Sequence, residues 1–387
     1  MRKLLFWILR IVLALCVAAL VVAIWKREEL QRLYAVNTLF DENRIVSNFS
    51  DMEGAFLTAH MPRSASTVND LPAGPTATLP AEVDPWITDR FVTSLLVAKS
   101  GAVVHESYYL GTGSEDQRIS WSIAKSYLSA LFGIVMAEGH IASLDDPVTQ
   151  YAPSLENTAY ANATVRNVLN MASGVVFDED YLDYDSDINR MGRVIALGGN
   201  LDDFAASLSE TFAAPGQTWQ YVSIDTHVIG MVLRGATGQS VVDLLRVKIL
   251  DPLQPEADAY YITDGDGVAF VLGGLNITTR DYARFGIMIE QSGQWNGQQI
   301  VPADWVAAST RASAPTEPGK TQYGYQWWSP SDARPGEFFG RGIYGQYLYI
   351  DQQKDIVIVV TAADRKFRER GVHTSNIEVL RRIADQI

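Results

Sequence analysis

Ser120-Trp121-Ser122-Ile123-Ala124-Lys125-Ser126 opens an apolar run whose spacing predicts a helix. Ser122 and Lys125 stand three residues apart, and residues at i and i+3 share one face of a helix, so their side chains can meet. A serine hydroxyl becomes a strong nucleophile when a neighbouring base takes its proton. A lysine acts as that base when burial or nearby positive charge lowers its pKa. The pair is a candidate nucleophile and activator; the plain alternative is a capped helix start with a solvated lysine.

The composition limits the classes of protein to which the chain can belong. Its 387 residues are 47% hydrophobic, enough to bury a core as one large domain or two subdomains. A net charge of -14 argues against nucleic acid or an anionic membrane surface as the main partner. Cys16 is the single cysteine, which excludes a disulfide framework and a cysteine-based metal site. The histidines are scattered, so we expect no metal and no cofactor.

An apolar segment at the amino end predicts a membrane-spanning helix. Residues 4–25 are apolar except for Arg10, and basic residues flank them on both sides. At ~1.5 Å per residue, a helix of this length crosses ~30 Å of hydrocarbon. A cleaved signal peptide ending at Val17-Ala18-Ala19 is the alternative, but residues 20–25 beyond it are still apolar. We therefore predict a signal-anchor over residues 1–27 and an exported (periplasmic or extracytoplasmic) catalytic portion.

The rest of the chain divides into an extension and a main body. We predict a short helical stalk and an irregular extension over residues 28–85, and a hydrolase body over residues 86–387. Residues 91–99 and 102–110 are rich in Val, Tyr and Leu and are joined by a Ser-Gly pair, which predicts a β-hairpin. The body therefore begins with two strands.

Helical patterns dominate the middle of the body, and strands return at its end. Residues 142–270 alternate short helical patterns with turn-rich loops, which predicts a mainly helical subdomain. Further helices are expected over residues 279–291, 303–310 and 374–386, and strands over residues 323–328, 344–351 and 355–361. Strands at both ends with helices inserted between them predict one sheet built from two separated pieces of chain, in an α/β fold of the α+β kind.

Two further motifs bear on the chemistry. Tyr221 lies in a loop, where its hydroxyl can pass protons to or from a leaving group; a packed loop aromatic is the alternative. The glycines of residues 339–346 let a substrate backbone approach closely and leave main-chain N–H groups free for an oxyanion; an ordinary glycine-rich turn is the alternative. The same residues satisfy Gly-x-Gly-x-x-Gly, but a strand follows them instead of a helix, so we reject a dinucleotide site.

The order of these motifs resembles the three-motif pattern of serine β-lactamases and penicillin-binding proteins. The matching residues are Ser122-x-x-Lys125, Tyr221-x-Ser223 and Gly340-Arg341-Gly342. More closely, the chain resembles the β-lactamase-related hydrolases that include class C enzymes, carboxylesterases and 6-aminohexanoate-dimer hydrolase. Within this group the branch of 6-aminohexanoate-dimer hydrolase fits best, because it also has Tyr-x-Ser at the second motif. The resemblance covers the whole predicted body and implies a β-lactamase/transpeptidase-like fold, with an antiparallel sheet flanked by helices.

The resemblance implies a role for each motif. Ser122 would be acylated, Lys125 would activate it, and Tyr221 would assist proton transfer in acylation and deacylation. The backbone N–H groups of Ser122 and Ile343 would form the oxyanion hole. The residues expected to contact the substrate are Tyr181, Ser223, Arg341 and Gly342.

Two residues depart from the family pattern. Gly340 stands where the third motif usually has Lys or His, a cation that helps to bind the substrate carboxylate in β-lactam enzymes. Arg341 replaces that cation only if its side chain faces the cleft and does not point away from it. Ser223 replaces a frequent Asn, whose amide orients the acyl side chain. Both departures favour esters or simple amides over penicillins.

An acidic stretch over residues 178–187 has two interpretations of about equal weight. Its position in the resemblance makes it a loop over the site, with Tyr181 as a substrate contact; otherwise it is a solvated acidic loop. The spacing of Asp183, Asp185 and Asp187 is that of a calcium loop. The glycine and the terminal glutamate of that motif are absent, so calcium is not expected.

The sequence therefore predicts a membrane-anchored, exported serine hydrolase that cleaves small esters or amides through an acyl-enzyme. β-Lactamase or D-Ala-D-Ala peptidase activity on cell-wall peptides is the alternative among enzymes. A non-catalytic protein that binds peptidoglycan peptides is the alternative of another class, and the intact Ser122, Lys125 and Tyr221 argue against it. The expected partners are a small-molecule ester or amide and, through the amino-terminal helix, a membrane, with no nucleic acid.

Overall fold

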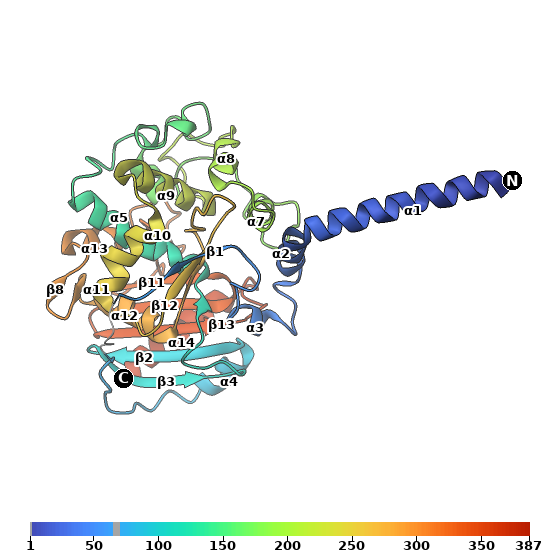
Figure 1. The fold of residues 1–387 in the computed structure, drawn as a ribbon. Helices are drawn as coiled ribbons and strands as arrows, with labels where there is room; N and C mark the ends of the chain where they lie inside the picture. The colour runs from blue at the N-terminus through green and yellow to red at the C-terminus, as the bar shows by residue number, and fades with distance from the viewer. Residues whose placement is uncertain (1, 65–69) are drawn as a thin grey trace.

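The fold is organised around an antiparallel sheet whose strands come from both ends of the body. A computed structural model describes residues 2–64 and 70–387. Within these residues the main sheet has the strand order β3-β2-β13-β12-β11-β10-β9, and paired strands are antiparallel. Its strands are β2 (Val92–Lys99), β3 (Ala102–Tyr108), β9 (Gln322–Gly324), β10 (Trp327–Ser329), β11 (Glu337–Gly342), β12 (Gln346–Asp351) and β13 (Ile356–Ala362). The pairing of β2 with β13 joins the two pieces of chain, as the sequence predicts (Figure 1).

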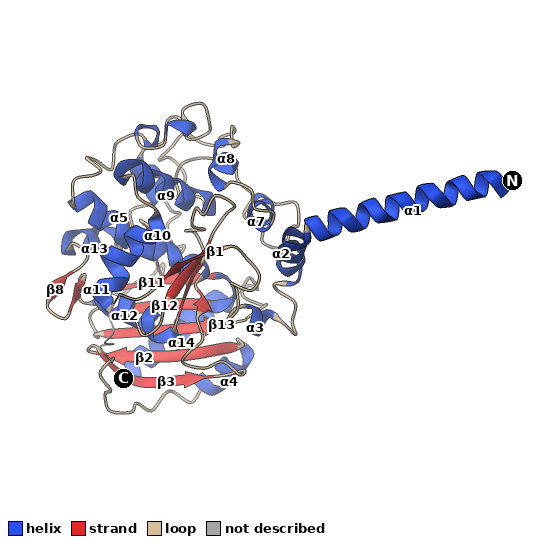
Figure 2. Cartoon of the chain, viewed as in Figure 1, coloured by secondary structure: helices blue, strands red, loops and turns tan. Residues whose placement is uncertain are grey.

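Helices cover both faces of the main sheet, and the pleat of each strand sends alternate side chains to opposite faces. In β13, Val357 and Val359 belong to the larger core, whereas Ile358 and Val360 belong to the smaller core on the other face. The helices involved are α5 (Ala124–Ala137) and α12 (Thr279–Glu290) in the larger core, and α4 (Val83–Asp89) and α14 (Val372–Gln386) in the smaller one. Figure 2 shows the resulting layers of helix and strand.

A mainly helical region is inserted between β3 and β9 and covers the upper part of Figure 1. Helix α5 is preceded by the 3-10 turn η1 (Trp121–Ile123), so Ser122 stands at the beginning of a long buried helix. Gly139, with a φ of 84°, follows the helix in the left-handed region that suits a glycine. The other helices are η2 (Val148–Gln150), η3 (Pro153–Leu155), α6 (Val165–Leu169), α7 (Asp187–Ala196), α8 (Leu201–Ala206), α9 (Ser223–Thr237), α10 (Val241–Leu245), the π-helix η4 (Arg246–Leu250), α11 (Asp251–Leu253) and α13 (Ala303–Ser309).

A second, smaller sheet has no counterpart in the sequence-based expectations. Its strands are β1 (Thr58–Met61), β5 (Ala259–Ile262), β6 (Leu275–Ile277) and β4 (Arg118–Ile119), in the order β1-β5-β6-β4. Strands of two to four residues are too short to show an alternating pattern of their own. A separate two-residue pair, β7 (Gln294–Trp295) and β8 (Gln298–Gln299), forms a small hairpin.

Residues 323–328, predicted as one strand, instead form a hairpin of β9 and β10. Tyr325 and Gln326 have φ values of 38° and 74°, so the chain reverses between the two strands. Likewise β12 begins at Gln346, two residues later than predicted, because Tyr344 has a φ of 59° inside the short turn η5 (Ile343–Gly345). In both places a residue with a left-handed backbone interrupts a run of strand-forming side chains, so the strand is shorter than predicted.

The amino-terminal segment consists of an exposed helix followed by residues that join the core. Helix α1 (Arg2–Trp25) is long and apolar enough to cross a membrane, a property that a signal sequence shares, and it projects from the body (Figure 1). Helix α2 (Arg27–Thr38) packs on α7, and Nε of Arg32 donates a hydrogen bond of 2.8 Å to the Ala196 carbonyl. Beyond α3 (Ile45–Asn48), Phe49 and Met52 are fully buried. Residues 39–52 therefore pack into the folded body.

Candidate active site

Ser122, in the turn η1, and Lys125, in the first turn of α5, meet on one face. The Nζ atom of Lys125 lies 2.9 Å from the Oγ atom of Ser122. Trp121, immediately before the serine, has a φ of 44°, a strained conformation for a bulky residue that is held by its aromatic packing against Phe49. The strained turn brings the chain abruptly from β4 into the helix, so the Ser122 side chain faces the pockets described below.

Burial perturbs the protonation of Lys125. Only 1% of the residue is exposed, and desolvation of its ammonium group lowers the pKa to about 7, while the charge of Glu179 acts in the opposite direction. Besides Ser122, its Nζ atom contacts the Leu272 carbonyl oxygen at 2.8 Å and the Ser223 Oγ atom at 3.1 Å. Near neutral pH the amine is therefore divided between its charged and neutral forms, and both forms have hydrogen-bond partners.

Ser223 links Lys125 to a carboxylate that the motif analysis did not single out. The hydroxyl of Ser223 donates a short hydrogen bond to Glu179, and its backbone N–H donates another of 2.8 Å to the same carboxylate. The hydroxyl of Tyr181 also donates to Glu179. Burial raises the pKa of Glu179, and the charge of Lys125 and these hydrogen bonds oppose that shift. Glu179 thus ties the acidic loop to the start of α9.

Tyr221 lies beside Lys125 in an aromatic cluster. Its ring stacks on Trp328 with centroids 5.0 Å apart and meets the edge of Tyr323 at 6.1 Å. The Nζ atom of Lys125 lies 5.3 Å from the centroid of the same ring. Burial and then the charge of Glu179 raise the pKa of Tyr221, so its phenol keeps its proton at neutral pH. A protonated phenol at this place is suited to donate a proton.

Strand β11 passes close to the serine. A Cβ atom on Gly342 would lie 2.7 Å from the Ser120 carbonyl oxygen, and one on Gly340 would lie 3.2 Å from Oγ of Ser126. At Gly342 the neighbouring atom is backbone, so only glycine lets the strand approach the start of α5 this closely. Arg341 faces the cleft: it lines a pocket with Ser122 and Tyr221, and its guanidinium carbon lies 6.0 Å from the Trp328 ring centroid.

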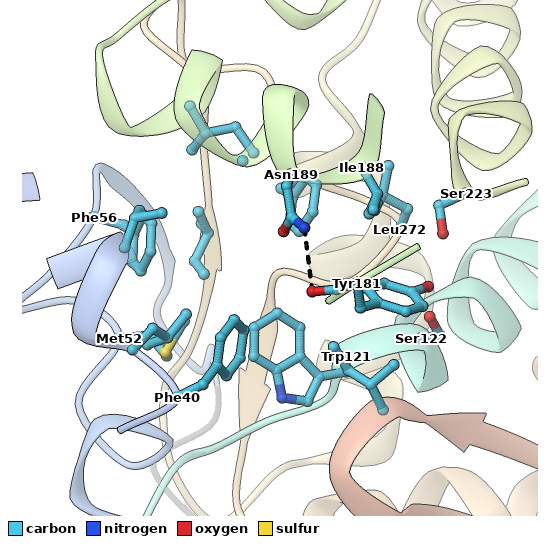
Figure 3. Close-up of a pocket in the computed structure, with 18 of the residues that line it drawn as sticks. Phe40, Met52, Phe56, Trp121, Ser122, Tyr181, Ile188, Asn189, Ser223 and Leu272 are labelled. Atoms are coloured by element: carbon cyan, nitrogen blue, oxygen red, sulfur yellow. Dashed lines mark hydrogen bonds between the residues drawn. The ribbon is translucent and has the colours of Figure 1, made fainter. Parts of the chain in front are cut away.

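Two pockets meet at Ser122, and Tyr181 and Ile343 also line both of them. The first is mostly apolar; Figure 3 shows Phe40 and Met52 at one end and Ser122 at the other. The second is lined by Ser122, Glu179, Tyr181, Tyr221, Trp328, Arg341, Gly342, Ile343, Phe367 and Arg368. A molecule whose reacting carbonyl sits at Ser122 therefore has space on both sides of that carbonyl.

The acidic loop that carries Tyr181 forms one wall of the site. Its backbone is fixed by the amide of Asn189, which donates a hydrogen bond of 3.1 Å to the Tyr181 carbonyl (Figure 3). Two carboxylates of the loop form ion pairs with residues outside it: Asp180 with Arg368, and Asp187 with Arg190. Over residues 2–64 and 70–387, no group of three or more His, Cys, Asp or Glu side chains is arranged to hold a metal ion.

Comparison with known proteins identifies the family. A family model described as β-lactamase matches residues 88–380, about three quarters of the chain. The chain belongs to the β-lactamase family. Within it, 6-aminohexanoate-dimer hydrolase of Paenarthrobacter ureafaciens is 30% identical over 297 residues, which cover 73% of this chain and 75% of that protein. The chain is therefore a serine hydrolase of a β-lactamase-related family that acts on amides and esters.

Solved structures confirm the β-lactamase fold. A protein of Bacillus anthracis, provisionally named 6-aminohexanoate-dimer hydrolase, superposes with a TM-score of 0.79 at 22% identity; the match covers 89% of this chain and 95% of that one. A family VIII carboxylesterase has a TM-score of 0.60 at 15% identity, covering 80% and 99% of the two chains. The predicted mixed fold with antiparallel strands and flanking helices is confirmed.

The fold of this β-lactamase-family chain brings all the sequence-selected site residues to one place. They are Ser122, Lys125, Tyr181, Tyr221, Ser223, Arg341, Gly342 and Ile343. Two features were missed. Glu179 is one of several acidic residues in its loop. The only signal in the sequence that could have identified it is its position two residues before Tyr181. The contribution of residues 36–56 to the apolar pocket had no local signal except scattered apolar side chains.

Proposed function

We propose that this β-lactamase-family hydrolase cleaves small carboxylic esters or amides through an acyl-enzyme on Ser122. The contact between Lys125 Nζ and Ser122 Oγ carries the proposal, because it joins a hydroxyl to an amine whose pKa is about 7. An amine of that pKa is neutral in a large fraction of molecules at neutral pH and can accept the serine proton. The names of the relatives, an amide hydrolase and a carboxylesterase, agree with this substrate range.

The proposed mechanism assigns one role to each of these groups. Neutral Lys125 takes the Oγ proton as Ser122 attacks the substrate carbonyl, and the resulting oxyanion receives the backbone N–H groups of Ser122 and Ile343. Tyr221 gives its proton to the leaving group and regains one from Lys125, which frees the alcohol or amine. Water then attacks the acyl-enzyme while neutral Lys125 accepts one of its protons. Lys125 returns that proton to the Oγ atom of Ser122 as the ester bond breaks and the carboxylic acid leaves.

Within the third motif, Gly340 supports esters or simple amides as substrates. Gly340 supplies no cation, and its missing side chain would point at Ser126 and Ile123. Arg341 lines the second pocket with Ser122 and Tyr221, and this one observation favours a substrate carboxylate, as in β-lactams or D-Ala-D-Ala peptides. The turnover of nitrocefin, a β-lactam, distinguishes these two substrate classes. We expect nitrocefin to be hydrolysed more slowly than p-nitrophenyl esters. Rapid hydrolysis of nitrocefin would make β-lactams the preferred class.

Helix α1 supports a membrane location for the enzyme. Beyond Arg2 and Lys3 it is apolar except for Arg10, and it is exposed throughout, as expected for a helix that lies in lipid. The proposal is an uncleaved anchor with an exported catalytic domain. Intact-mass measurement of the membrane fraction tests it: a chain that retains residues 2–25 supports the anchor, and a mature chain that begins after them identifies a signal peptide.

Labelling with a serine-directed phosphonate tests the catalytic assignment. Ser122→Ala is expected to lose both turnover of p-nitrophenyl esters and labelling, while Ser114→Ala, a serine outside both pockets, keeps both. Labelling of Ser122→Ala at another serine would remove Ser122 from the mechanism. Retained binding of peptidoglycan peptides without any adduct in the wild-type chain would instead support the non-catalytic binding protein.

A further inference from the structure

We propose that the apolar pocket beside Ser122 binds the acyl chain of the substrate, so that the preferred substrates carry a linear apolar acyl chain. This inference rests on the proposed function and specifies its substrate class. Most of the side chains that line the pocket are apolar, among them Val36, Phe40, Met52 and Phe56, and the polar ones include hydroxyls and the amide of Asn189. None of these side chains carries a charge.

The polarity of the pocket changes along its length. Figure 3 shows the hydroxyls of Ser122 and Ser223 at one end, whereas Phe40, Met52 and Phe56 form the other end. A polar or charged acyl group that entered the apolar end would lose its hydration without gaining a partner, which is costly. Moving a methylene group from water into the apolar end is favourable, and each buried methylene increases the affinity by up to about fourfold. The pocket therefore selects a chain that is apolar away from its carbonyl.

The position of Tyr221 decides which half of the substrate enters this pocket. A group that protonates the leaving group must lie beside it. Tyr221 lines the second pocket, with Trp328 and Arg341, and does not line the apolar one. Ser122 and Ile343 line both and so lie at their junction. The leaving group consequently occupies the second pocket, and the acyl chain occupies the apolar one.

Part of the pocket wall comes from the segment that follows helix α1. Val36 belongs to α2 and lies eleven residues after Trp25, a separation of at most ~17 Å along helical chain. If α1 is embedded in a bilayer, the pocket is held near the lipid surface. The acyl chain can then come from a bilayer lipid or from a soluble ester, and the chemistry that the pocket recognises is the same for both.

Gly192 offers a way to narrow the pocket without disturbing the fold. It lines the pocket from the middle of α7, and a Cβ atom there would have no neighbour within 4 Å. A larger side chain can therefore project into the free space, and replacing a helical glycine also favours the helix. Gly113→Leu is the matched control, because a Cβ atom at Gly113 also meets nothing and the residue lies outside both pockets.

The experiment compares p-nitrophenyl acetate with p-nitrophenyl octanoate, using the full chain in lipid nanodiscs. For the wild-type chain we expect kcat/KM to be at least about tenfold higher for the octanoate, given the gain for each buried methylene. Gly192→Leu should lower that octanoate-to-acetate ratio by about tenfold, and Gly113→Leu should leave it unchanged. Release of fatty acid from the nanodisc phospholipid, measured in parallel, tells a bilayer source from a soluble one.

The outcomes separate this inference from the proposed function. Turnover of the acetate with phosphonate labelling of Ser122, but with equal kcat/KM for both esters, would overturn the acyl-chain pocket and leave the hydrolase assignment intact. An unchanged ratio in Gly192→Leu would also overturn it. Absence of turnover for every ester, together with no labelling of Ser122, would instead overturn the proposed function.

Discussion

The Oγ atom of Ser223 lies 3.1 Å from the Nζ atom of Lys125, and the single hydroxyl proton of Ser223 is directed to Glu179. Because that proton is engaged, the oxygen of Ser223 can only accept from Lys125. The Leu272 carbonyl, 2.8 Å away, is likewise an acceptor. A neutral lysine amine has two N–H donors and one lone pair. The two acceptors use both donors and leave the lone pair for the hydroxyl proton of Ser122.

The first prediction concerns the pH dependence of the wild-type enzyme. Burial lowers the pKa of Lys125 to about 7, and only the deprotonated amine can act as the base. Activity is therefore expected to fall as the pH decreases through this pKa: kcat/KM for a p-nitrophenyl ester should be about tenfold lower at pH 6 than at pH 8. A pH–rate profile measures this directly. A profile that is flat from pH 5.5 to pH 8.5 would contradict Lys125 as the titrating base.

The second prediction concerns Glu179, whose charge holds the pKa of Lys125 higher than burial alone would. Glu179→Gln removes the charge, so the acid limb of the kcat/KM profile should move to lower pH. The plateau rate should also fall, because the hydroxyl of Ser223 is then free to turn its proton toward the lone pair of Lys125.

Asp185→Asn is the matched control for Glu179→Gln. It removes a carboxylate from the same loop, but Asp185 is exposed to solvent and lies outside both pockets. Its charge should be screened, and its pH profile should match that of the wild-type chain. An acid limb that stays in place in Glu179→Gln, or that moves equally in both variants, would show that Glu179 does not tune Lys125.

The third prediction separates the role of Tyr221 by the choice of leaving group. An alkylamide needs a proton on its leaving nitrogen, whereas p-nitrophenolate leaves without one. Tyr221→Phe should therefore lower kcat by about 10²–10⁴ for an amide and by a smaller factor for the p-nitrophenyl ester of the same acid. Equal losses for the two substrates would mean that Tyr221 does not act as the proton donor.

Tyr323→Phe is the control for Tyr221→Phe. Tyr323 packs against the edge of Tyr221 in the same aromatic cluster. Its buried hydroxyl has no hydrogen-bond partner in the described part of the chain, so removing the oxygen costs little. Steady-state rates for both substrates should stay close to those of the wild-type chain. This control tests whether any loss in Tyr221→Phe comes from altered packing.

Local patterns in the sequence predicted the elements that carry the site. The helical spacing after Ser122 predicted α5, and strand-forming residues around Ser100-Gly101 predicted the β2–β3 hairpin. At that hairpin both turn residues have positive φ values, 50° and 78°, which fits a two-residue turn of this kind. The order of the three motifs, matched to the family pattern, then indicated that Ser122, Tyr221 and Gly340 lie close together. The spacing of residues within each motif does not give this information. These predictions rest on short-range physics that a single sequence contains.

The features that the sequence did not predict depend on contacts between distant segments. The small sheet pairs residues 58–61 with residues 259–262, and such short strands have no pattern without their partners. Glu179 stands in a stretch of acidic residues whose local character is that of a solvated loop. Glu179 joins the site only because Ser223, 44 residues later, donates two hydrogen bonds to it. Burial of this kind is a property of the tertiary structure.

The last prediction concerns Gly133, which lets the helix that carries Ser122 and Lys125 pack against α13. A Cβ atom at Gly133 would lie 2.2 Å from the indole ring of Trp305. That ring cannot easily move, because its Nε1 donates a hydrogen bond of 2.9 Å to the Ser129 carbonyl and its face stacks on Tyr325. Gly133→Ala should therefore destabilise the fold by about 1–3 kcal/mol, although alanine is the better helix former.

Gly192→Ala is the matched variant for this test, since it makes the same change in helix α7. A Cβ atom at Gly192 meets nothing, so this variant should be as stable as the wild-type chain or more stable by up to ~1 kcal/mol. Thermal unfolding of the full chain in detergent, followed by circular dichroism, compares the two. If both variants unfold at the wild-type temperature, α5 and α13 have room for the added Cβ atom, which contradicts the 2.2 Å separation expected between that atom and the Trp305 ring. A loss of stability confined to Gly133→Ala shows that the contact between α5 and Trp305 of α13 is the cause.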